Sequence, residues 1–472
     1  MEEPFSELIS SLPYSYDVKD NAAAIRGDYE RYEGKEVSLA GRIVAVRASG
    51  KLIFLDLLDE TGKIQCYVDF ASMGEAKFSQ IKSYNSGDII GVLGSVFKTK
   101  AGEITVKVGD VALLAKALKQ LPDKWHGLQD VELRYRKRFL DLIVNPEVRG
   151  IFRKRSNAIK SIRTFLDNLG FIEIETPVIQ PLYGGADAEP FKTFVNTLGE
   201  EDYLRIANEL YLKRLVIGGF NKVYEIYKAF RNEDIDTTHS PEFTMVELYQ
   251  AYTDYNEMME LTESMLYNIA KGVCQSSRLK YGDLEVDFEP PFKRLSFVGS
   301  INQKLGVDIL RLGDEELFKA AESHGIRFEK GKRNRAHAYE KLLETLVQPE
   351  LTNPTFVIDF PRETSPLTRP KRGNPELVER FELYAAGMEL VNAYSELNNP
   401  FIQKKNFELQ EERALSGDKE AEPLDKDFVD AMEYGMPPTG GLGLGVDRLV
   451  MLLTNKQSIK EVIPFPMEKR QK

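Results

Sequence analysis

Hydrophobic and polar residues alternate in short runs between residues 36 and 115, and this pattern predicts five β-strands. The runs cover residues 36–46, 52–58, 63–70, 88–99 and 104–114, with glycines in the turns between them. Five short strands with such turns are typical of a small closed barrel of the OB type. We therefore expect an OB-fold barrel over residues 36–118, preceded by a helical segment over residues 1–35.

The outer surface of this barrel carries candidates for contact with unpaired bases. Phe54 or Tyr67 could stack on a base, and Gln65 and Arg47 could read base edges. The periodicity alone favours a different place for Phe54, in the barrel core.

After the barrel the pattern becomes polar and then takes on helical spacing. Residues 119–148 are charged and contain helix-breaking prolines such as Pro122, which suits a linker. Over residues 149–169 apolar side chains recur every three or four positions, and Gly170 follows, so we expect an amphipathic helix. Residues 172–177 alternate and end in a proline, which predicts a short edge strand. A helix leading into such a strand suits a subunit interface.

Two further strands are predicted on either side of a ten-residue polar loop, over residues 223–231 and 242–252. On the second strand Phe243, Glu247 and Tyr249 share one face, because side chains alternate along a strand. That face would carry an aromatic ring, a carboxylate and a phenol. Helices are expected over residues 255–271 and 312–350, and a strand pair over residues 381–396, bent at residues 385–387.

The composition indicates a globular chain of two or three domains, with 472 residues of which 42% are apolar. A net charge of −11 argues against indiscriminate coating of nucleic acid, so any RNA contact must be local. Cys66 and Cys274 are far apart and lack nearby histidines, so neither a disulfide framework nor a zinc site is expected. No apolar run approaches the roughly 20 residues of a membrane-spanning helix, and the first residues do not resemble a signal peptide. We expect a cytoplasmic protein without membrane contact.

Two arginines that are remote in the sequence are candidates for holding one ATP molecule. Activation of a carboxylate by ATP brings two anions together, so the protein must align them and neutralise their charge. Arginine suits this task because it is always charged and donates two parallel hydrogen bonds. We expect Arg231 to contact the α-phosphate and the substrate carboxylate, and Arg448 to stack on adenine and contact the γ-phosphate.

Five more residues complete the expected nucleotide site. Phe243 offers a flat face to adenine, Glu233 an acceptor for its amino group, and His239 a contact to the γ-phosphate. Glu382 and Glu389 flank the predicted bend, where two carboxylates could bridge ATP phosphates through Mg²⁺.

One stretch runs Phe230-Arg231-Asn232-Glu233 into Thr238-His239-Ser240-Pro241-Glu242-Phe243, and another reads Gly441-Leu442-Gly443-Leu444-Gly445-Val446-Asp447-Arg448. They resemble motifs 2 and 3 of a class II aminoacyl-tRNA synthetase. The glycines over residues 440–445 do not fit dinucleotide spacing, and we expect them to let a strand and a helix approach the nucleotide closely.

Further stretches extend the resemblance to nearly the whole chain, about residues 36–470. They are Lys124-Trp125-His126-Gly127-Leu128, Arg134-Tyr135-Arg136-Lys137-Arg138-Phe139-Leu140-Asp141-Leu142, Gly184-Gly185-Ala186, Glu209-Leu210-Tyr211-Leu212-Lys213-Arg214-Leu215 and Asn392-Ala393-Tyr394-Ser395-Glu396-Leu397-Asn398. Together they resemble a class II lysyl-tRNA synthetase. The signatures of the other synthetase class, His-Ile-Gly-His and Lys-Met-Ser-Lys-Ser, are absent.

This resemblance implies an α+β protein, with an OB-fold anticodon-binding barrel in front of a six-stranded antiparallel catalytic sheet flanked by helices. The catalytic domain would cover residues 149–472, with motif 1 at about 149–181, motif 2 at 223–252, motif 3 at 440–454 and a helical insertion at 312–350. It also implies a homodimer formed through motif 1. Lysine and ATP would give lysyl-adenylate, and the terminal ribose hydroxyl of tRNA(Lys) would then take the lysyl group.

The resemblance also implies roles for individual residues. Lysine would be surrounded by Gly185, Glu209, Glu247, Tyr249, Asn392, Tyr394 and Glu396. ATP and Mg²⁺ would be held by Arg231, Glu233, His239, Phe243, Glu382, Glu389 and Arg448, and the anticodon would be read by Phe54 and Gln65. An ammonium side chain needs anionic and hydrogen-bonding partners in a partly dry pocket, and the acids in this set would supply them.

Some positions depart from the family pattern, and other functions compete with this interpretation. Asn208, Asp234, Ser240, Asn399 and Pro464 depart from residues that are usual in the family. Asp234 and Ser240 bear on the ATP contacts of the motif 2 loop, whereas Pro464 resembles aspartyl and asparaginyl relatives. An aspartyl- or asparaginyl-tRNA synthetase would share the architecture but needs cations where this chain has acids. A lysyl transferase acting on a protein would lack the barrel. A synthetase-like binding protein without catalysis would usually have lost a motif arginine or a metal carboxylate.

Overall fold

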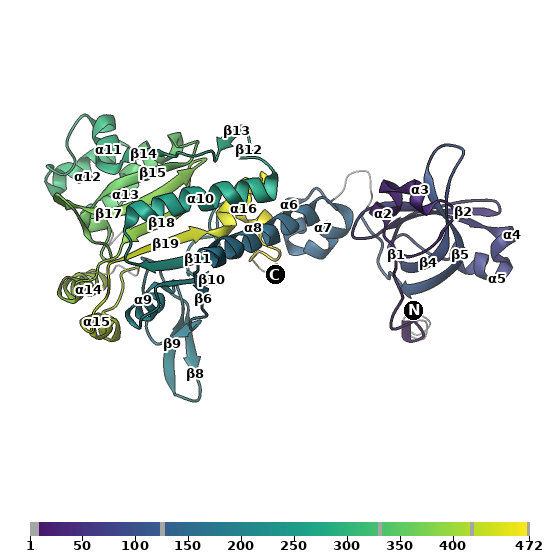
Figure 1. Cartoon of the computed structure of the whole chain (residues 1–472), viewed down its shortest axis with the longest axis horizontal. Helices are drawn as coiled ribbons and strands as arrows, with labels where there is room; N and C mark the ends of the chain where they lie inside the picture. Colours follow the sequence, from purple (N-terminus) through teal and green to yellow (C-terminus); the bar gives the residue numbers. More distant parts are fainter. Residues whose placement is uncertain (1–8, 123–127, 329–332, 416–419, 470–472) are drawn as a thin grey trace. The chain divides into compact units, whose positions relative to one another are not determined.

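The computed structural model describes residues 9–122, 128–328, 333–415 and 420–469. The chain divides into two compact units, Met1–Gln129 and Asp130–Lys472 (Figure 1). In the part of the chain that is described, no helix is long and apolar enough to cross a membrane.

The first unit is built around a closed five-stranded barrel, as predicted. Its strands are β1 (Glu36–Ser49), β2 (Leu52–Leu58), β3 (Lys63–Asp69), β4 (Ile89–Lys98) and β5 (Ile104–Ala115), and its helices are α2 (Ala22–Gly27), α3 (Tyr29–Tyr32), α4 (Phe70–Met73) and α5 (Glu75–Lys82). The strands follow the order β1-β2-β3-β5-β4, and β1 closes the barrel by pairing with both β2 and β4. The segment predicted to be helical before the barrel is helical only in part where it is described, at residues 9–10 and in α2 and α3, since residues 13–21 hold no helix.

Phe54 lies on the outer face of the barrel, so its assignment to the core from periodicity is wrong. Its neighbours Ile53 and Leu55 are fully buried inside the barrel, whereas Phe54 is half-buried. Because side chains alternate along a strand, burial of Ile53 and Leu55 turns Phe54 outward. Its ring packs instead at a tilt against Tyr67, with ring centroids 5.4 Å apart and an angle of 49° between the ring planes.

The second unit begins with two short helices, where a linker was expected over residues 119–148. Their bounds are α6 (Val131–Arg136) and α7 (Arg138–Val144). Arg138 and Asp141 are both buried and pair at 2.8 Å, and the guanidinium also donates to the carbonyl of Lys460 at 2.7 Å. These bonds fix α7 to the residues around Lys460. The polar residues that suggested a linker therefore include a buried ion pair. Residues 123–127 of the expected linker lie outside the described part.

Most of the second unit belongs to one large sheet and the helices around it. The strands are β6 (Ile172–Glu173), β7 (Ile179–Gln180), β8 (Lys192–Val195), β9 (Glu200–Leu204), β10 (Lys222–Phe230), β11 (Glu242–Ala251), β12 (Arg278–Tyr281), β13 (Leu284–Asp287), β14 (Lys293–Ser296), β15 (Thr355–Pro361), β16 (Pro370–Lys371), β17 (Asn374–Ala385), β18 (Met388–Ser395) and β19 (Thr439–Gly445). The helices are α8 (Val148–Asn168), α9 (Glu209–Ile217), α10 (Tyr255–Cys274), α11 (Phe297–Leu305), α12 (Asp314–Ser323), α13 (Arg335–Leu346), α14 (Pro400–Leu415), α15 (Lys426–Glu433), α16 (Val446–Thr454) and α17 (Ile459–Val462), with short 3-10 turns at Gln348–Glu350 and Arg362–Thr364.

The centre of the sheet is antiparallel and six-stranded, as the resemblance implied. Across the described residues the strand order is β14-β15-β17-β18-β19-β11-β10-β6, and every pair from β15 to β10 is antiparallel. The outer strands β14 and β6 add to it in parallel, and β16 pairs with β17. The predicted bend of the β17–β18 hairpin is confirmed at Ala386 and Gly387, which both adopt positive φ, at 50° and 71°.

Helices α8, α10 and α16 cover one face of this sheet (Figure 1). Ile162 and Leu166 of α8 and Met265 of α10 are fully buried in the core that they form with the strands. The amphipathic helix predicted over residues 149–169 is therefore confirmed as α8. The region expected to be helical over residues 312–350 contains α12 and α13 in its described part. Helices α8, α10 and α16 cover one face of the sheet. The polar residues that alternate with core residues along the strands therefore point to the other face.

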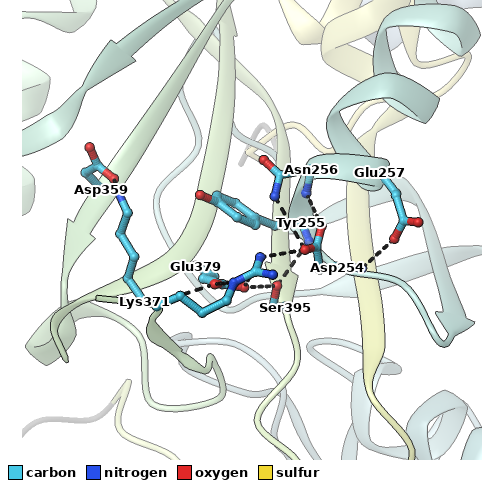
Figure 2. A network of polar contacts seen from close by, with 9 residues as sticks. Asp254, Tyr255, Asn256, Glu257, Asp359, Lys371, Glu379 and Ser395 are labelled. Atoms are coloured by element: carbon cyan, nitrogen blue, oxygen red, sulfur yellow. Dashed lines mark hydrogen bonds and ion pairs between the residues drawn. The ribbon is translucent and has the colours of Figure 1, made fainter. Parts of the chain in front are cut away.

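A polar network ties the start of α10 to strands β17 and β18 (Figure 2). Ser395 donates to Glu379 at 2.6 Å and accepts the backbone N–H of Tyr255 at 3.0 Å. Arg372 joins Glu379 to the α10 cap residue Asp254 through contacts of 2.5 Å each. Glu379 and Ser395 thus hold two neighbouring strands to one helix.

Replacement of Ser395 by alanine should lower the free energy of unfolding by about 1–3 kcal/mol, because the buried Glu379 carboxylate loses a donor and the Tyr255 N–H loses its acceptor. Chemical denaturation followed by circular dichroism measures the change. Ser264→Ala, at an exposed position of α10, is the matched control and should change the free energy by less than about 0.5 kcal/mol. An equal loss in both variants would contradict the role of this network.

Candidate active site

A cavity of about 840 Å³ lies against the polar face of the sheet in the second unit. Residues from β11, β17, β18, β19 and α13 line it, together with the loop before β11. Every residue that the sequence assigned to lysine, ATP or Mg²⁺ is among them. These residues are Gly185, Glu209, Arg231, Glu233, His239, Phe243, Glu247, Tyr249, Glu382, Glu389, Asn392, Tyr394, Glu396 and Arg448.

The register of the sheet brings these residues together in cross-strand rows. One row runs from Glu382 through Asn392 and Gly443 to Glu247. The next runs from Arg380 through Tyr394 and Gly441 to Tyr249. In each row the central strand β19 contributes a glycine, so the floor of the cavity has no side chain at its middle.

The glycines of β19 make room for neighbouring side chains as well as for a ligand. A Cβ at Gly441 would lie 2.0 Å from a carboxylate oxygen of Glu396 and 2.5 Å from the Tyr249 ring. Both distances are too short for any side chain. We expected these glycines to serve close approach to the nucleotide, but Gly441 is required by Glu396 and Tyr249.

Three carboxylates and one buried lysine form the deepest part of the cavity. Lys213 is fully buried, and its ammonium contacts the carboxylates of Glu209 and Glu396. Burial opposes the charged form of Lys213, but the two carboxylates raise the pKa of its ammonium above the usual value. Burial raises the pKa of Glu396 to about 8, although Lys213 opposes this shift.

Glu247, the third carboxylate, is held by two phenols. Tyr227 donates to one of its oxygens at 2.5 Å and Tyr249 to the other at 3.3 Å. Burial, and then the nearby Glu209 carboxylate, raise the pKa of Glu247 to about 8. The pocket therefore contains three buried acids and one lysine, and a further cation would relieve the excess negative charge.

The two motif arginines lie at the other part of the same cavity. The Arg231 guanidinium lies 5.2 Å from the ring centroid of Phe243 and donates to the carbonyl of Ile206 at 3.5 Å. Arg448 donates to the backbone carbonyl of Glu389 at 2.8 Å, and its other terminal nitrogen lies 3.1 Å from His239 Nε2. Motif 2 and motif 3 are thus in direct contact through His239 and Arg448.

Neighbouring interactions fix both the motif 2 loop and the start of α16. Asp236 accepts the N–H groups of Thr238 and His239 at 2.6 and 2.7 Å. Burial opposes ionisation of Asp236, but these bonds and the His239 ring lower its pKa to about 2. Asp447, next to Arg448, accepts from buried Arg155 at 2.5 Å and from the N–H of Thr244 at 2.6 Å.

Arg380 links the two parts of the cavity and was not singled out from the sequence. Its guanidinium contacts the carboxylate of Glu382 and donates to the side chain of Asn392 at 3.1 Å. Glu382 also accepts from Tyr384 at 2.5 Å. Burial is the main cause that raises the pKa of Glu382, Arg380 lowers it, and Glu389 raises it further.

Glu382 and Glu389 are the residues of this cavity that suit a divalent cation. After burial, the charge of Glu389 is a further cause of the raised pKa of Glu382, and a bound cation would relieve this repulsion. Mg²⁺ is commonly bound through one or two carboxylates together with substrate phosphates, and Glu382 and Glu389 match this kind of ligand set.

Local patterns could have identified two of the missed residues. Lys213 stands four residues after Glu209 on one helix, which places the two side chains on the same face. Arg380 stands two residues before Glu382 on one strand, which gives both the same orientation. Their partners Glu396 and Asn392 lie on another strand, so the pairings themselves depend on the tertiary structure.

The anticodon candidates lie together on one outer face of the barrel. Arg47 stands opposite Phe54 in the β1–β2 pair, and Phe54 stands opposite Tyr67 in the β2–β3 pair. Arg47 forms an ion pair with Asp56 at 2.7 Å, and Gln65 accepts from Thr105 at 3.0 Å. Phe97 extends the aromatic surface, with its ring centroid 5.9 Å from that of Tyr67.

Comparison with known proteins assigns both units to families. Residues 130–469 match the family described as tRNA synthetases class II (D, K and N), and residues 37–114 match the OB-fold nucleic acid binding domain. A lysine–tRNA ligase of Clostridium tetani is 50% identical over 448 residues, which cover 94% of this chain and 89% of that protein. A lysine–tRNA ligase of Thermotoga maritima is 48% identical, and the matched residues cover 100% of this chain and 95% of that protein. The chain therefore belongs to the class II tRNA synthetases of the D, K and N family, with an OB-fold nucleic acid binding domain before the catalytic part.

Proposed function

We propose that this protein is a lysine–tRNA ligase, which activates L-lysine with ATP and transfers the lysyl group to the 3′ end of tRNA(Lys). The observation that carries this proposal is one cavity in which a buried acidic pocket adjoins two motif arginines. The high identity to lysine–tRNA ligases over nearly the full chain supports it.

The charge balance of the pocket favours a cationic amino acid. Glu209, Glu247 and Glu396 are opposed by Lys213, which contacts two of them, and by the charge of Arg231, which lowers the pKa of Glu247. The ammonium of lysine would bring the missing positive charge, with Tyr249, Asn392 and Tyr394 as polar neighbours and Gly185 beside the α-amino group.

An aspartate- or asparagine-specific enzyme is less consistent with these contacts. The carboxylate of aspartate needs a free cation, and Lys213 is already held by two glutamates. Bringing a fourth carboxylate into this pocket would add repulsion in a poorly solvated place. The acid excess thus separates lysine from aspartate, and asparagine, being neutral, would not bring the positive charge that the pocket lacks.

In the activation step the chain's own residues align two anions and neutralise charge. Arg231 would hold the lysine carboxylate and the α-phosphate, so that a carboxylate oxygen attacks phosphorus while the bond to pyrophosphate breaks. Phe243 and Arg448 would enclose adenine, Glu233 would accept from its amino group, and His239 and Arg448 would contact the γ-phosphate.

Glu382 and Glu389 would hold Mg²⁺, which neutralises phosphate charge when it is bound. Arg380 and Tyr384 orient the carboxylate of Glu382 for this purpose. Such support of a metal-binding carboxylate by outer hydrogen bonds is common at metal sites.

For recognition of tRNA we propose the outer face of the barrel, with Phe54 stacking on an anticodon base and Gln65 and Arg47 reading base edges. The proposal is supported by the half-buried rings of Phe54 and Tyr67, which offer a flat apolar surface beside polar groups.

We also propose a homodimer formed through the region from α8 to β7. Large apolar side chains are exposed there, including Leu169, Ile172, Val178 and Ile179, between 42% and 48% exposed. A row of such residues is typical of an interaction surface. Light scattering should give twice the chain mass of 53.7 kDa; a monomer at micromolar concentration would contradict this assembly.

Replacement of Arg231 by alanine should abolish lysine-dependent exchange between ATP and pyrophosphate, with a loss of at least about 100-fold in kcat, because the developing charge loses its partner. Lysine binding measured by calorimetry should weaken much less. Arg278→Ala, at an exposed ion pair of β12, is the control and should leave exchange unchanged. Near-normal exchange in Arg231→Ala would refute the assigned role.

Replacement of Phe54 by alanine should weaken tRNA charging but leave amino-acid activation intact, because stacking is worth about 1–3 kcal/mol per base. The two activities are measured by aminoacylation of tRNA and by pyrophosphate exchange. Tyr14→Ala removes a fully exposed aromatic ring outside the barrel strands and serves as control. Equal losses in both assays would indicate a folding role for Phe54.

Lysine binding should tighten as the pH rises, because Glu247 and Glu396 have pKa values of about 8 and bind an ammonium only when ionised. Below its pKa each carboxyl is neutral, so from pH 6 to pH 7.5 the dissociation constant should fall by about 20-fold or more. Calorimetry across this range measures the slope. Glu247→Gln should bind lysine more weakly and with a flatter pH profile, and an unchanged slope would disprove the link to this group.

A further inference from the structure

A further buried carboxylate, Glu422, lines the cavity and is not explained by the motifs. It is 2% exposed, and its Oε2 atom has no hydrogen-bond partner in the described chain. The neighbouring charges are two acids and one cation, namely Asp187, Glu209 and Lys213. Burial first, then Asp187 and Glu209, raise the pKa of Glu422 to about 8.

Bonds on both sides hold Glu422 in this position. Asp425 accepts the N–H of Phe428 at 2.8 Å as the cap of α15, and it forms an ion pair with Arg214 of α9 at 2.6 Å. The buried residue Ala421 accepts a hydrogen bond from the Tyr183 hydroxyl at 3.5 Å. Glu422 is therefore carried by a segment fixed to α9, the helix that also bears Glu209 and Lys213.

A buried carboxylate with an open oxygen needs a cationic partner. An isolated buried charge costs several kcal/mol, which a hydrogen-bonded cation offsets. Lys213 lowers the pKa of Glu422, but its ammonium contacts Glu209 and Glu396. The backbone N–H of Gly185 also favours the ionised form of Glu422. An ammonium group arriving with a ligand would provide the missing partner.

The position of Glu422 in the pocket indicates which ammonium it meets. Glu396 lies at the fully buried end, where its charged neighbours are Lys213, Glu209 and Glu247. Among the acids that raise the pKa of Glu422, Asp187 has the largest effect, and Asp187 is exposed, so this side of the pocket faces the open part of the cavity. The reacting carboxylate of lysine must lie on the open side to reach ATP, and its α-ammonium is one carbon away.

We propose that Glu422 is a substrate-binding residue that holds the α-ammonium group of lysine, while Glu396 lies at the end that receives the ε-ammonium group. This inference rests on the proposed lysine-activating function and adds an anionic contact to it.

The test compares two ligands on the full-length protein by calorimetry. L-Lysine has both ammonium groups, whereas 6-aminohexanoic acid lacks the one on the α-carbon. Glu422→Gln should weaken lysine binding by about 10- to 100-fold, the range for a lost hydrogen bond to a charged group, and change 6-aminohexanoate binding by less than about twofold. Glu396→Gln should weaken both ligands.

Two further variants and a kinetic measurement make the result specific. Glu422→Asp keeps the charge on a shorter side chain and should bind lysine with intermediate affinity. Glu412→Gln removes an exposed charge on α14 and should behave as the wild type in all assays. In pyrophosphate exchange Glu422→Gln should raise KM for lysine with kcat unchanged within about threefold, because the contact is made in the ground state as well.

Either of two outcomes would overturn the proposal. Unchanged lysine binding in Glu422→Gln would show that the carboxylate makes no contact with the substrate. Equal weakening of lysine and 6-aminohexanoate would place it at the ε-ammonium end. Failure of the proposed function itself is distinguishable, because the wild-type protein would then show no lysine-dependent exchange.

Discussion

The active-site cavity depends on a central strand without side chains on one of its faces. Gly441 and Gly443 of β19 lie in the middle of two cross-strand rows. The side chains on both sides can therefore extend over positions at which β19 itself has no side chain. The space over Gly441 is taken by Glu396 and Tyr249, which approach the position of an absent Cβ to 2.0 and 2.5 Å. A single methyl group there would displace a carboxylate and a phenol together. The glycine pattern is thus a requirement of the amino-acid pocket as well as of motif 3.

The pocket created in this way concentrates acids where water is scarce. Burial raises the pKa values of Glu247 and Glu396 to about 8, and the Lys213 ammonium contacts Glu396. Such an arrangement is costly for the ligand-free protein and favourable for a ligand that brings positive charge. Selectivity for a cationic ligand and stability of the protein are therefore linked. The buried carboxylates repel one another in the ligand-free pocket, and a ligand that brings positive charge relieves this repulsion.

Strands β17 and β18 serve the core on one face and the site on the other. Glu379 and Ser395 join these strands to α10, and the next residue in each strand, Arg380 and Glu396, points into the cavity. Because successive side chains alternate, a network that fixes the strand register on one face also fixes it on the other. This explains how the side chains that line the two parts of the cavity can be held in place by a few interactions on the opposite face of the same strands.

The sequence by itself determined the elements and the chemistry carried on single elements. Strand alternation predicted the shared face of Phe243, Glu247 and Tyr249, helical spacing predicted α8, and every residue that the motifs assigned to lysine, ATP or Mg²⁺ lines the cavity. It did not determine that Phe54 lies outside the barrel, or that Arg138 and Asp141 form a buried pair within the expected linker. Only the tertiary structure decided these points, and likewise the contacts of Lys213 with Glu396, of Arg380 with Asn392 and of Glu422 with the cavity. The reason is physical: periodicity records which side of its own element a residue occupies, whereas burial and pairing depend on which distant element packs against that side.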